Sequence, residues 1–545
     1  MNNGTRALKL CRFIAAVAVL VYAPDAMATG QTRVISADGT TSNDHSSLSA
    51  AVAACTGGET VKLLDNSETL SADLGISVDI TLDLGGFTAN FGNKNLASAS
   101  NTRVVVTNGV IKSITNINAG SGAVVDLYDS TVVCGVFAAG SGTLNVYDGC
   151  FVRATTMLSS PWANGAVNIY GGEIVPTVER SAGYENRGIK TTVYGGTFSI
   201  VPFNNDYDRF NLAEGRVAVC TNYSRTAVGS SYTFHYKVTL EDGCDLVASL
   251  SSGVYAEKLG ESFAAGVAGD VVTLLKDCTQ TTRTEIKRDV VFDLGGHTLT
   301  GTGDRNHVIS IPDSNDGISA VISNGTVVAV ENNSCVLTYR NADVTLGKGL
   351  TLRGAYACFF NGINGSVSID GASVETTTMC NFYTVGNASF VVRGDSVVNV
   401  TKFKALNTQD DSFAVAEGGL WNLDPAGYVT NNFVKLHRSG AATYKYQVVP
   451  WEDICTEGWT FRVGDEAPVV SGTCYTPLAP IAVRYEGDSP ERKTLVADFS
   501  GLVLSSPSDS LSFESAPGLE KSLALTYEDS KLYASLLRGF TILFR

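Results

Sequence analysis

The sequence repeats one short pattern four times, as Leu127-Tyr-Asp-Ser-Thr-Val-Val, Val146-Tyr-Asp-Gly-Cys-Phe-Val, Ile169-Tyr-Gly-Gly-Glu-Ile-Val and Val193-Tyr-Gly-Gly-Thr-Phe-Ser. Each copy consists of an apolar residue, a tyrosine, a turn and further apolar residues, and the copies recur every 19 to 24 residues. A fixed period of this size is typical of a solenoid, in which each coil buries its apolar face against the next. The pattern therefore predicts stacked coils of short strands.

The small period continues later in the chain, where an apolar residue recurs every 23 residues at Leu346, Ile369, Val392 and Val415. A longer repeat is also present, because the stretch 80–86 (Ile-Thr-Leu-Asp-Leu-Gly-Gly) returns 210 positions later at 290–296. An alanine-rich segment precedes each copy, and the first, Ser46 to Cys55, predicts a short serine-capped helix. The chain is therefore expected to contain two tandem solenoids, over 29–250 and 251–450.

The composition supports an all-β fold, because 55 glycines and few lysines favour strands and tight turns over long helices. From residue 451 onward the strand patterns lose the coil period. They predict a C-terminal β-sandwich-like domain over 451–545, which would cap the open edge of the last coil or serve as an attachment module.

Several corner motifs resemble those of a known superfamily. Asp83-Leu-Gly-Gly, Asp293-Leu-Gly-Gly-His-Thr-Leu-Thr-Gly, Thr107-Asn-Gly-Val-Ile and Ser323-Asn-Gly-Thr-Val are similar to the opening coils of right-handed parallel β-helix proteins of the pectate-lyase-like superfamily. The helix and strand before them resemble the secreted, adhesin-type surface members of that group. The resemblance implies the fold over about 46–430 and says little about activity, since the motifs are corner and core residues.

The first 28 residues have the features of a secretory signal peptide. Basic residues precede an apolar run from Phe13 to Tyr22 that is too short to span a membrane, and Ala26-Met-Ala28 fits a cleavage site. We expect cleavage after Ala28 and a secreted or cell-surface protein. The formal net charge of −15 disfavours nucleic acid as a partner, and no later segment is long and apolar enough for a transmembrane helix.

Alternation places the four tyrosines Tyr128, Tyr147, Tyr170 and Tyr194 outside the coils, in line with one another. A polar row lies two residues before them on the same face and includes Asp126, Asn145 and Asn168. One interpretation is an aromatic platform that binds an extended glycan or a surface protein. The other is a structural ladder of stacked rings that needs no ligand.

Eleven of the twelve cysteines follow the signal segment. Cys335, Cys358 and Cys380 recur at 23 and 22 residues, which predicts an inward stack that is either a buried thiol ladder or contains one disulfide. Cys220 with Cys244, and Cys455 with Cys474, are further candidate pairs. The spacings do not match a zinc site, and no metal or cofactor is expected.

Catalytic motifs of β-helix enzymes are not recognisable. Asp410 and Asp411 lack a neighbouring Gly-His-Gly, and Asp370 with Arg393 lacks the acidic cluster of a calcium-dependent lyase and is better explained as an ion pair between coils. We therefore expect a non-catalytic, adhesin-like or glycan-binding protein. The alternatives are a polysaccharide lyase or glycoside hydrolase acting on an acidic or neutral glycan, and a structural spacer.

Overall fold

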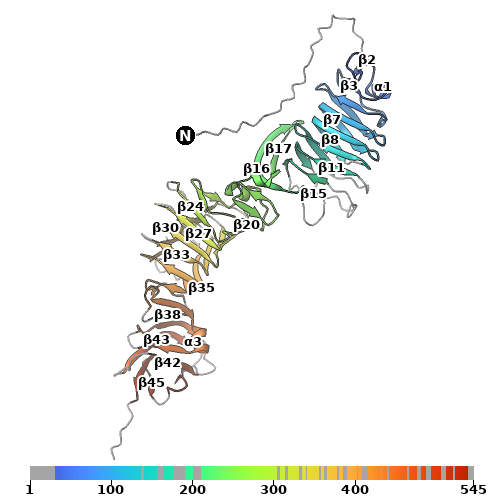
Figure 1. Ribbon diagram of the computed structural model, residues 1–545. Coiled ribbons are helices and arrows are strands. Elements are labelled where there is room, and N and C mark those ends of the chain that lie inside the picture. Colours follow the sequence, from blue (N-terminus) through green and yellow to red (C-terminus); the bar gives the residue numbers. More distant parts are fainter. Residues whose placement is uncertain are drawn as a thin grey trace, which may run out of the picture. The chain divides into compact units, whose positions relative to one another are not determined.

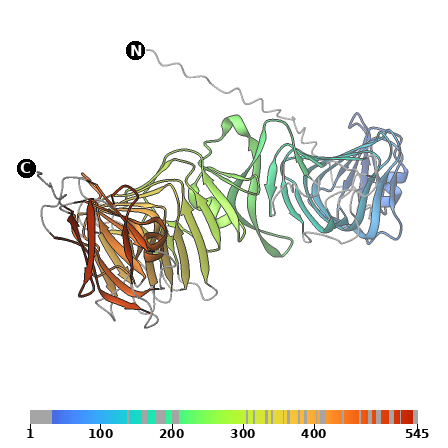
Figure 2. The same ribbon diagram turned by 90° about the horizontal axis from the view of Figure 1, so that it is seen from below.

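The computed structural model divides into two compact units, one built mainly from residues up to Val167 and the other mainly from Asn168 onward. Within each unit the strands lie side by side in rows, as Figures 1 and 2 show. The structure describes residues 31–136, 140–157, 165–176, 191–199, 210–303, 307–312, 317–330, 334–338, 341–354, 357–360, 365–376, 380–384, 389–401, 403–407, 415–430, 432–438, 441–462, 465–474, 480–486, 493–504, 511–519 and 522–537.

The fold is all-β, with 59% strand and 6% helix, and forms a parallel β-solenoid of about 14 turns. This confirms the predicted fold class and the interpretation of the short repeats as coils. The predicted domain boundaries after residues 250 and 450 stay predictions.

Unit 1 opens with a small antiparallel lead-in. Strand β1 (Thr32–Ile35) pairs antiparallel with both β2 (Ser42–His45) and β3 (Glu59–Leu63). Helix α1 (Leu48–Ala53) lies between β2 and β3 in the chain, and its cap residue Ser47 accepts a hydrogen bond from the Ala50 amide at 3.1 Å. The serine-capped helix predicted from the sequence is therefore confirmed.

The coils of unit 1 stack through parallel strands. Successive pairs join β3, β5 (Ile80–Asp83), β7 (Arg103–Ala119), β8 (Val124–Val136) and β9 (Thr143–Val146). Their register aligns Leu82, Val106, Leu127 and Val146 in one buried column, as the periodicity predicted. The remaining strands are β4 (Leu74–Ile76), β6 (Thr88–Ser98), β10 (Phe151–Met157) and β11 (Ala166–Ile169), at which the units divide.

Unit 2 begins with short strands and a long antiparallel hairpin. In it Ile169 and Val193 are buried, which agrees with their predicted inward orientation. The hairpin joins β16 to β17, and β17 also pairs antiparallel with β14. The elements are β12 (Glu173–Pro176), β13 (Thr191–Val193), β14 (Gly196–Phe198), β15 (Phe210–Leu212), β16 (Arg216–Ala227), β17 (Ser230–Leu240) and the 3-10 helix η1 (Glu241–Gly243).

A second copy of the lead-in follows the hairpin. Strand β18 (Ala248–Leu250) pairs antiparallel with β19 (Tyr255–Ala256) and β20 (Asp270–Leu274), and helix α2 (Leu259–Ala265) lies between β19 and β20. Parallel coils then stack through β20, β23, β26, β29, β32, β35 and β37. The same element order at the start of both copies confirms the predicted duplication.

The coils of the second copy contain β21 (Cys278–Gln280), β22 (Thr284–Glu285), β23 (Val290–Asp293), β24 (Thr298–Gly301), β25 (Ile309–Ile311), β26 (Ile318–Ser323), β27 (Gly325–Ala329), β28 (Ser334–Thr338), β29 (Ala342–Leu346), β30 (Leu350–Gly354), β31 (Ala357–Phe360), β32 (Ser366–Asp370), β33 (Ser373–Thr376), β34 (Cys380–Thr384), β35 (Ser389–Asn399), β36 (Phe403–Asn407) and β37 (Ala416–Trp421). A second face of these coils is the parallel sheet β22-β25-β28-β31-β34-β36.

One corner is built the same way in both copies. The carboxylate of Asp83 accepts the Gly85 amide at 2.9 Å, and that of Asp293 accepts the Gly295 amide at 2.8 Å. A Cβ on Gly109 would lie 2.3 Å from the Leu84 Cβ, and one on Gly325 would lie 2.4 Å from the Leu294 Cβ. Only glycine fits at these two positions, so the corner has the same backbone geometry in both copies.

The apolar column of the second copy ends differently from the prediction. Leu346, Ile369 and Val392 align in register and are buried, but Val392 pairs with Ala416 and not with Val415. Ala416 and Val415 are both buried. The prediction was wrong there, because the pairing of β35 with β37 is not a constant 23-residue step.

The C-terminal region has two sheets around one core. Strands β40, β42 and β44 pair in parallel, as do β41 and β43, while β43, β46 and β45 are antiparallel. The core includes Trp451, Trp459 and Phe499. The elements are β38 (Phe433–His437), β39 (Tyr446–Pro450), α3 (Trp451–Glu457), β40 (Trp459–Phe461), β41 (Val469–Cys474), β42 (Ile481–Tyr485), β43 (Thr494–Leu504), β44 (Phe513–Ser515), β45 (Leu523–Glu528) and β46 (Lys531–Leu536).

Candidate functional site

The outer face of unit 1 carries a stacked pair of tyrosines. The register of β8 and β9 aligns Leu127 with Val146, so the outward residues that follow them, Tyr128 and Tyr147, lie side by side. Their ring centroids are 4.2 Å apart and the ring planes differ by 6°. At this spacing each ring covers one face of the other. The stacking therefore covers one face of each ring.

The two residues of the polar row that lie in unit 1 are buried and not open to solvent. Asp126 is 0% exposed and Asn145 is also buried, although the sequence pattern placed both on the outer surface. The Asn145 amide donates to one Asp126 oxygen at 2.8 Å, and the Arg103 guanidinium binds the other at 2.8 and 2.9 Å. The expected exposure of Asp126 and Asn145 was therefore wrong, since Asp126 holds Arg103 and Asn145 holds Asp126, while a contact of these residues with a ligand stays a prediction.

Arg103 is the exposed group of this cluster, with 62% of its side chain accessible to solvent. The hydrogen bond and charge of Asp126 raise the pKa of Arg103, and burial beside Tyr128 raises the pKa of Tyr147 to about 12. Sequence reasoning missed Arg103. Arg103 lies 23 residues before Asp126, and it lies two residues before Val105, which pairs with Asp126. This spacing could have indicated the contact between Arg103 and Asp126.

Unit 2 carries the other two tyrosines. Tyr170 and Tyr194 stack with centroids 4.7 Å apart and an interplanar angle of 17°, and Tyr170 is 40% exposed. Asn168 is half-buried at the end of β11. The structure thus contains two stacked pairs, one in each unit, while ligand binding by these residues stays a prediction.

The three periodic cysteines do not share one backbone column. Cys335 and Cys358 hold equivalent register positions between β28 and β31, but β34 pairs Phe382 with Phe359, which shifts Cys380 by one residue. Cys335 is buried, with its sulfur 3.6 Å from the Val327 carbonyl oxygen. The side chains of Cys358 and Cys380 lie outside the described residues, so a bond between them stays a prediction.

The candidate pair Cys220–Cys244 does not form, since both carry free thiols. Cys220 is buried, which raises the pKa of its thiol to about 12, and the Cys244 thiol donates to the Leu240 carbonyl at 3.1 Å. The predicted pairing was wrong because Cys220 is buried on β16 opposite Tyr236, whereas Cys244 follows the hairpin as the last cap residue of η1 and its thiol is bound to Leu240. The side chains of Cys455 and Cys474 lie outside the described residues.

The described residues do not show the side-chain arrangement that a lyase or a hydrolase would need. Asp370 and Arg393 are aligned in register, yet the guanidinium of Arg393 binds Glu417 at 2.9 Å. Asp410 and Asp411 lie outside the described residues. Among the residues that are described, no group of three or more His, Cys, Asp or Glu side chains could hold a metal ion.

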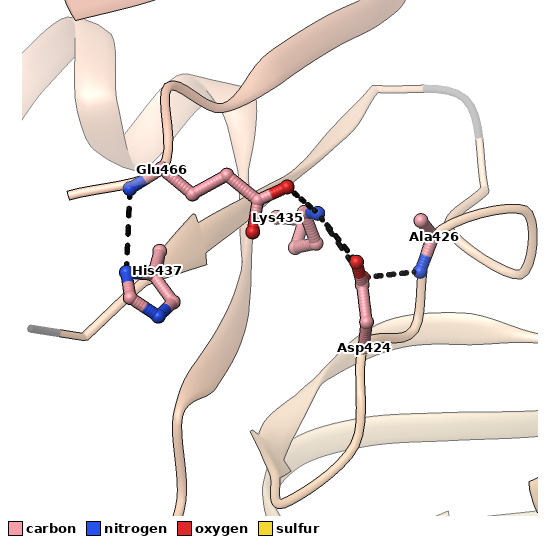
Figure 3. A network of polar contacts seen from close by, with 5 residues as sticks. All are labelled: Asp424, Ala426, Lys435, His437 and Glu466. Atoms are coloured by element: carbon pink, nitrogen blue, oxygen red, sulfur yellow. Dashed lines mark hydrogen bonds and ion pairs between the residues drawn. The ribbon is translucent and has the colours of Figure 1, made fainter.

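A second polar cluster lies where the last coil meets the C-terminal strands (Figure 3). Lys435, on β38, has a side chain only 11% exposed, and its ammonium lies 3.0 Å from Asp424 and 3.3 Å from Glu466. The Glu466 amide also donates to His437 at 3.3 Å. Because a nearly buried ammonium needs charged partners, this cluster ties three segments of the chain together. We assign it a structural role.

In comparisons with known proteins, no protein-family model, curated protein or solved structure matches the chain. Within the described part of the chain, the helices are too short or too polar to cross a bilayer.

Proposed function

We propose that this protein is a secreted or cell-surface, non-catalytic β-solenoid of the adhesin type that binds an extended glycan on the outer face of unit 1. The amino-terminal segment supports export. The corner motifs support the right-handed winding of the pectate-lyase-like superfamily. The single observation that carries the binding proposal is the exposed guanidinium of Arg103, anchored on a buried carboxylate beside two stacked tyrosines.

The arrangement suits recognition of a polar, extended chain. Asp126 and Asn145 fix the orientation of Arg103 before any ligand arrives, so little side-chain entropy is lost on binding. The guanidinium fork matches carboxylate groups and hydroxyl-rich edges. The tyrosine hydroxyls offer further hydrogen bonds on the neighbouring coils, which lie about 4.8 Å apart.

A structural spacer is the second candidate. The observation that favours it is the close, parallel stacking of Tyr128 and Tyr147, because ring faces that cover each other are not open to a sugar ring. A spacer would retain the ladder and show no glycan affinity.

The test is a glycan-array and polysaccharide-binding screen with residues 29–545. Arg103→Lys keeps a positive charge over Asp126 and removes the planar fork, so we expect affinity for the retained glycan to fall about tenfold. Arg353→Lys is the matched control, since Arg353 is an exposed arginine paired with Glu375 on another coil. Equal binding by wild type and Arg103→Lys would contradict the proposal, and release of reducing or unsaturated sugar ends would contradict the non-catalytic assignment.

A further inference from the structure

A hollow of about 640 Å³ lies beside helix α2 at the start of the second copy. One side is formed by Gly260, Phe263 and Ala264 of α2, and the other by the segment 282–288. A hollow of this size is in the range of small-ligand sites in proteins. The polar groups that line it decide which ligand it could accept.

Four charged side chains line this hollow, and three of them are cationic: Arg283, Lys287 and Arg288, with Glu285 between them. Arg283 binds Glu285 at 2.8 Å, and Lys287 binds it at 2.9 Å. Both contacts lower the pKa of Glu285. One carboxylate therefore balances one of three positive charges, although the chain as a whole carries a formal charge of −15.

Two of these cations remain open to solvent while the third is fixed. The side chains of Arg283 and Lys287 are 42% and 65% exposed. Arg288 donates to the Phe263 and Ala264 carbonyls, at 3.1 and 2.6 Å, which holds its guanidinium at the end of α2. Cations held at the wall of a hollow attract anions more strongly than the same groups on an open surface, because the surrounding protein reduces screening.

The first copy of the repeat shows that the fold does not require these charges. Its matching segment lies 210 residues earlier, and the buried positions Leu74 and Ile76 there correspond to Thr284 and Ile286. The residues that correspond to Arg283, Glu285, Lys287 and Arg288 are Asp73, Gly75, Ser77 and Val78. The same coil thus forms without any basic residue at these positions, so their presence in the second copy needs another explanation.

We propose that this hollow binds the sulfate or carboxylate groups of an acidic polysaccharide. Arg283 and Lys287 supply exposed cationic donors, and Arg288 supplies one that is held by backbone carbonyls. The guanidinium groups bind such oxyanions through paired hydrogen bonds. This site is separate from the tyrosine face of unit 1, and it would operate whether or not that face binds a glycan.

The experiment measures binding of a sulfated oligosaccharide, a uronic-acid oligosaccharide and a desulfated counterpart to residues 29–545 by isothermal titration calorimetry. The key variant is Arg283→Asp with Lys287→Ser, which installs the residues of the first copy. We expect wild type to bind at least one acidic ligand, with affinity that falls as salt rises. The double variant should lose at least tenfold in affinity, and the desulfated ligand should bind weakly.

Arg353→Gln serves as the control, because it removes one cation from an exposed ion pair on another coil. It should leave affinity unchanged. Lys287→Ser alone provides a milder variant, and the thermal unfolding midpoint of each variant shows whether it is folded. Failure of wild type to bind either acidic ligand, equal affinity for the desulfated ligand, or unchanged binding by the folded variants would overturn the proposal. The Arg103→Lys variant should bind these ligands at this site as wild type does, which separates the two proposals.

Discussion

The cluster of Arg103, Asp126 and Asn145 leads to an unusual order of mutational effects, in which the exposed residue matters more than the buried one. Arg103→Met removes the cation but keeps part of the apolar stem, so the Asp126 carboxylate stays buried with Asn145 as its donor. Removing one partner of a buried ion pair costs about 3–5 kcal/mol. Because one donor remains and water can approach, we expect about 3 kcal/mol.

Asp126→Asn should cost less, although Asp126 is 0% exposed. This substitution leaves a neutral amide in the buried position, and Arg103, already 62% exposed, regains hydration. The loss is then limited to charge-assisted hydrogen bonds, about 1.5–3 kcal/mol, and the value should lie at the lower end. Adding Asp126→Asn to Arg103→Met should restore stability relative to Arg103→Met alone, since it removes the unpaired charge.

Hydrogen exchange of the β7 and β8 amides measures these differences locally, which avoids assuming two-state unfolding of a long solenoid. A loss of 3 kcal/mol corresponds to roughly hundredfold faster exchange through opening of this region. A larger cost for Asp126→Asn than for Arg103→Met, or a double variant less stable than Arg103→Met, would refute this reasoning.

Three further predictions follow from single sites. Gly109→Ala and Gly325→Ala should each lower the free energy of unfolding, measured with urea, by about 1–3 kcal/mol, because the new Cβ would lie 2.3 or 2.4 Å from a leucine Cβ of the previous coil. Variants that unfold at the same urea concentration as the wild type would contradict the corner geometry. Two backbone amides and a threonine hydroxyl donate to the Glu59 carboxylate and lower its pKa to about 2. Its contribution to stability should therefore be complete above the unfolded pKa of about 4.3 and disappear as pH falls to about 2. An NMR titration midpoint near 4 for Glu59 would contradict this. Under native, non-reducing conditions, an alkylating reagent should modify Cys244 well before the buried Cys220, and a disulfide-linked peptide of the two would show this assignment to be wrong.

Much of the fold was predictable because its determinants are local and periodic. Alternation within each strand decides which side chains face inward, so Leu127, Val146, Ile169 and Val193 were correctly placed in the core. The paired glycines and asparagines of the corners likewise act over a few residues. The candidate site was less predictable, since the partner of Asp126 lies 23 residues away on the preceding coil.

The sequence by itself determined the period, the inward columns, the serine-capped helix and the duplication of the lead-in. The tertiary structure decided what depends on register and on neighbours from other coils. It shifted Ala416 into the column expected for Val415, moved Cys380 out of line with Cys358, and buried Asp126 beneath Arg103. The physical reason is that periodicity fixes the face on which a side chain lies, whereas burial and pairing depend on which residue the next coil brings beside it.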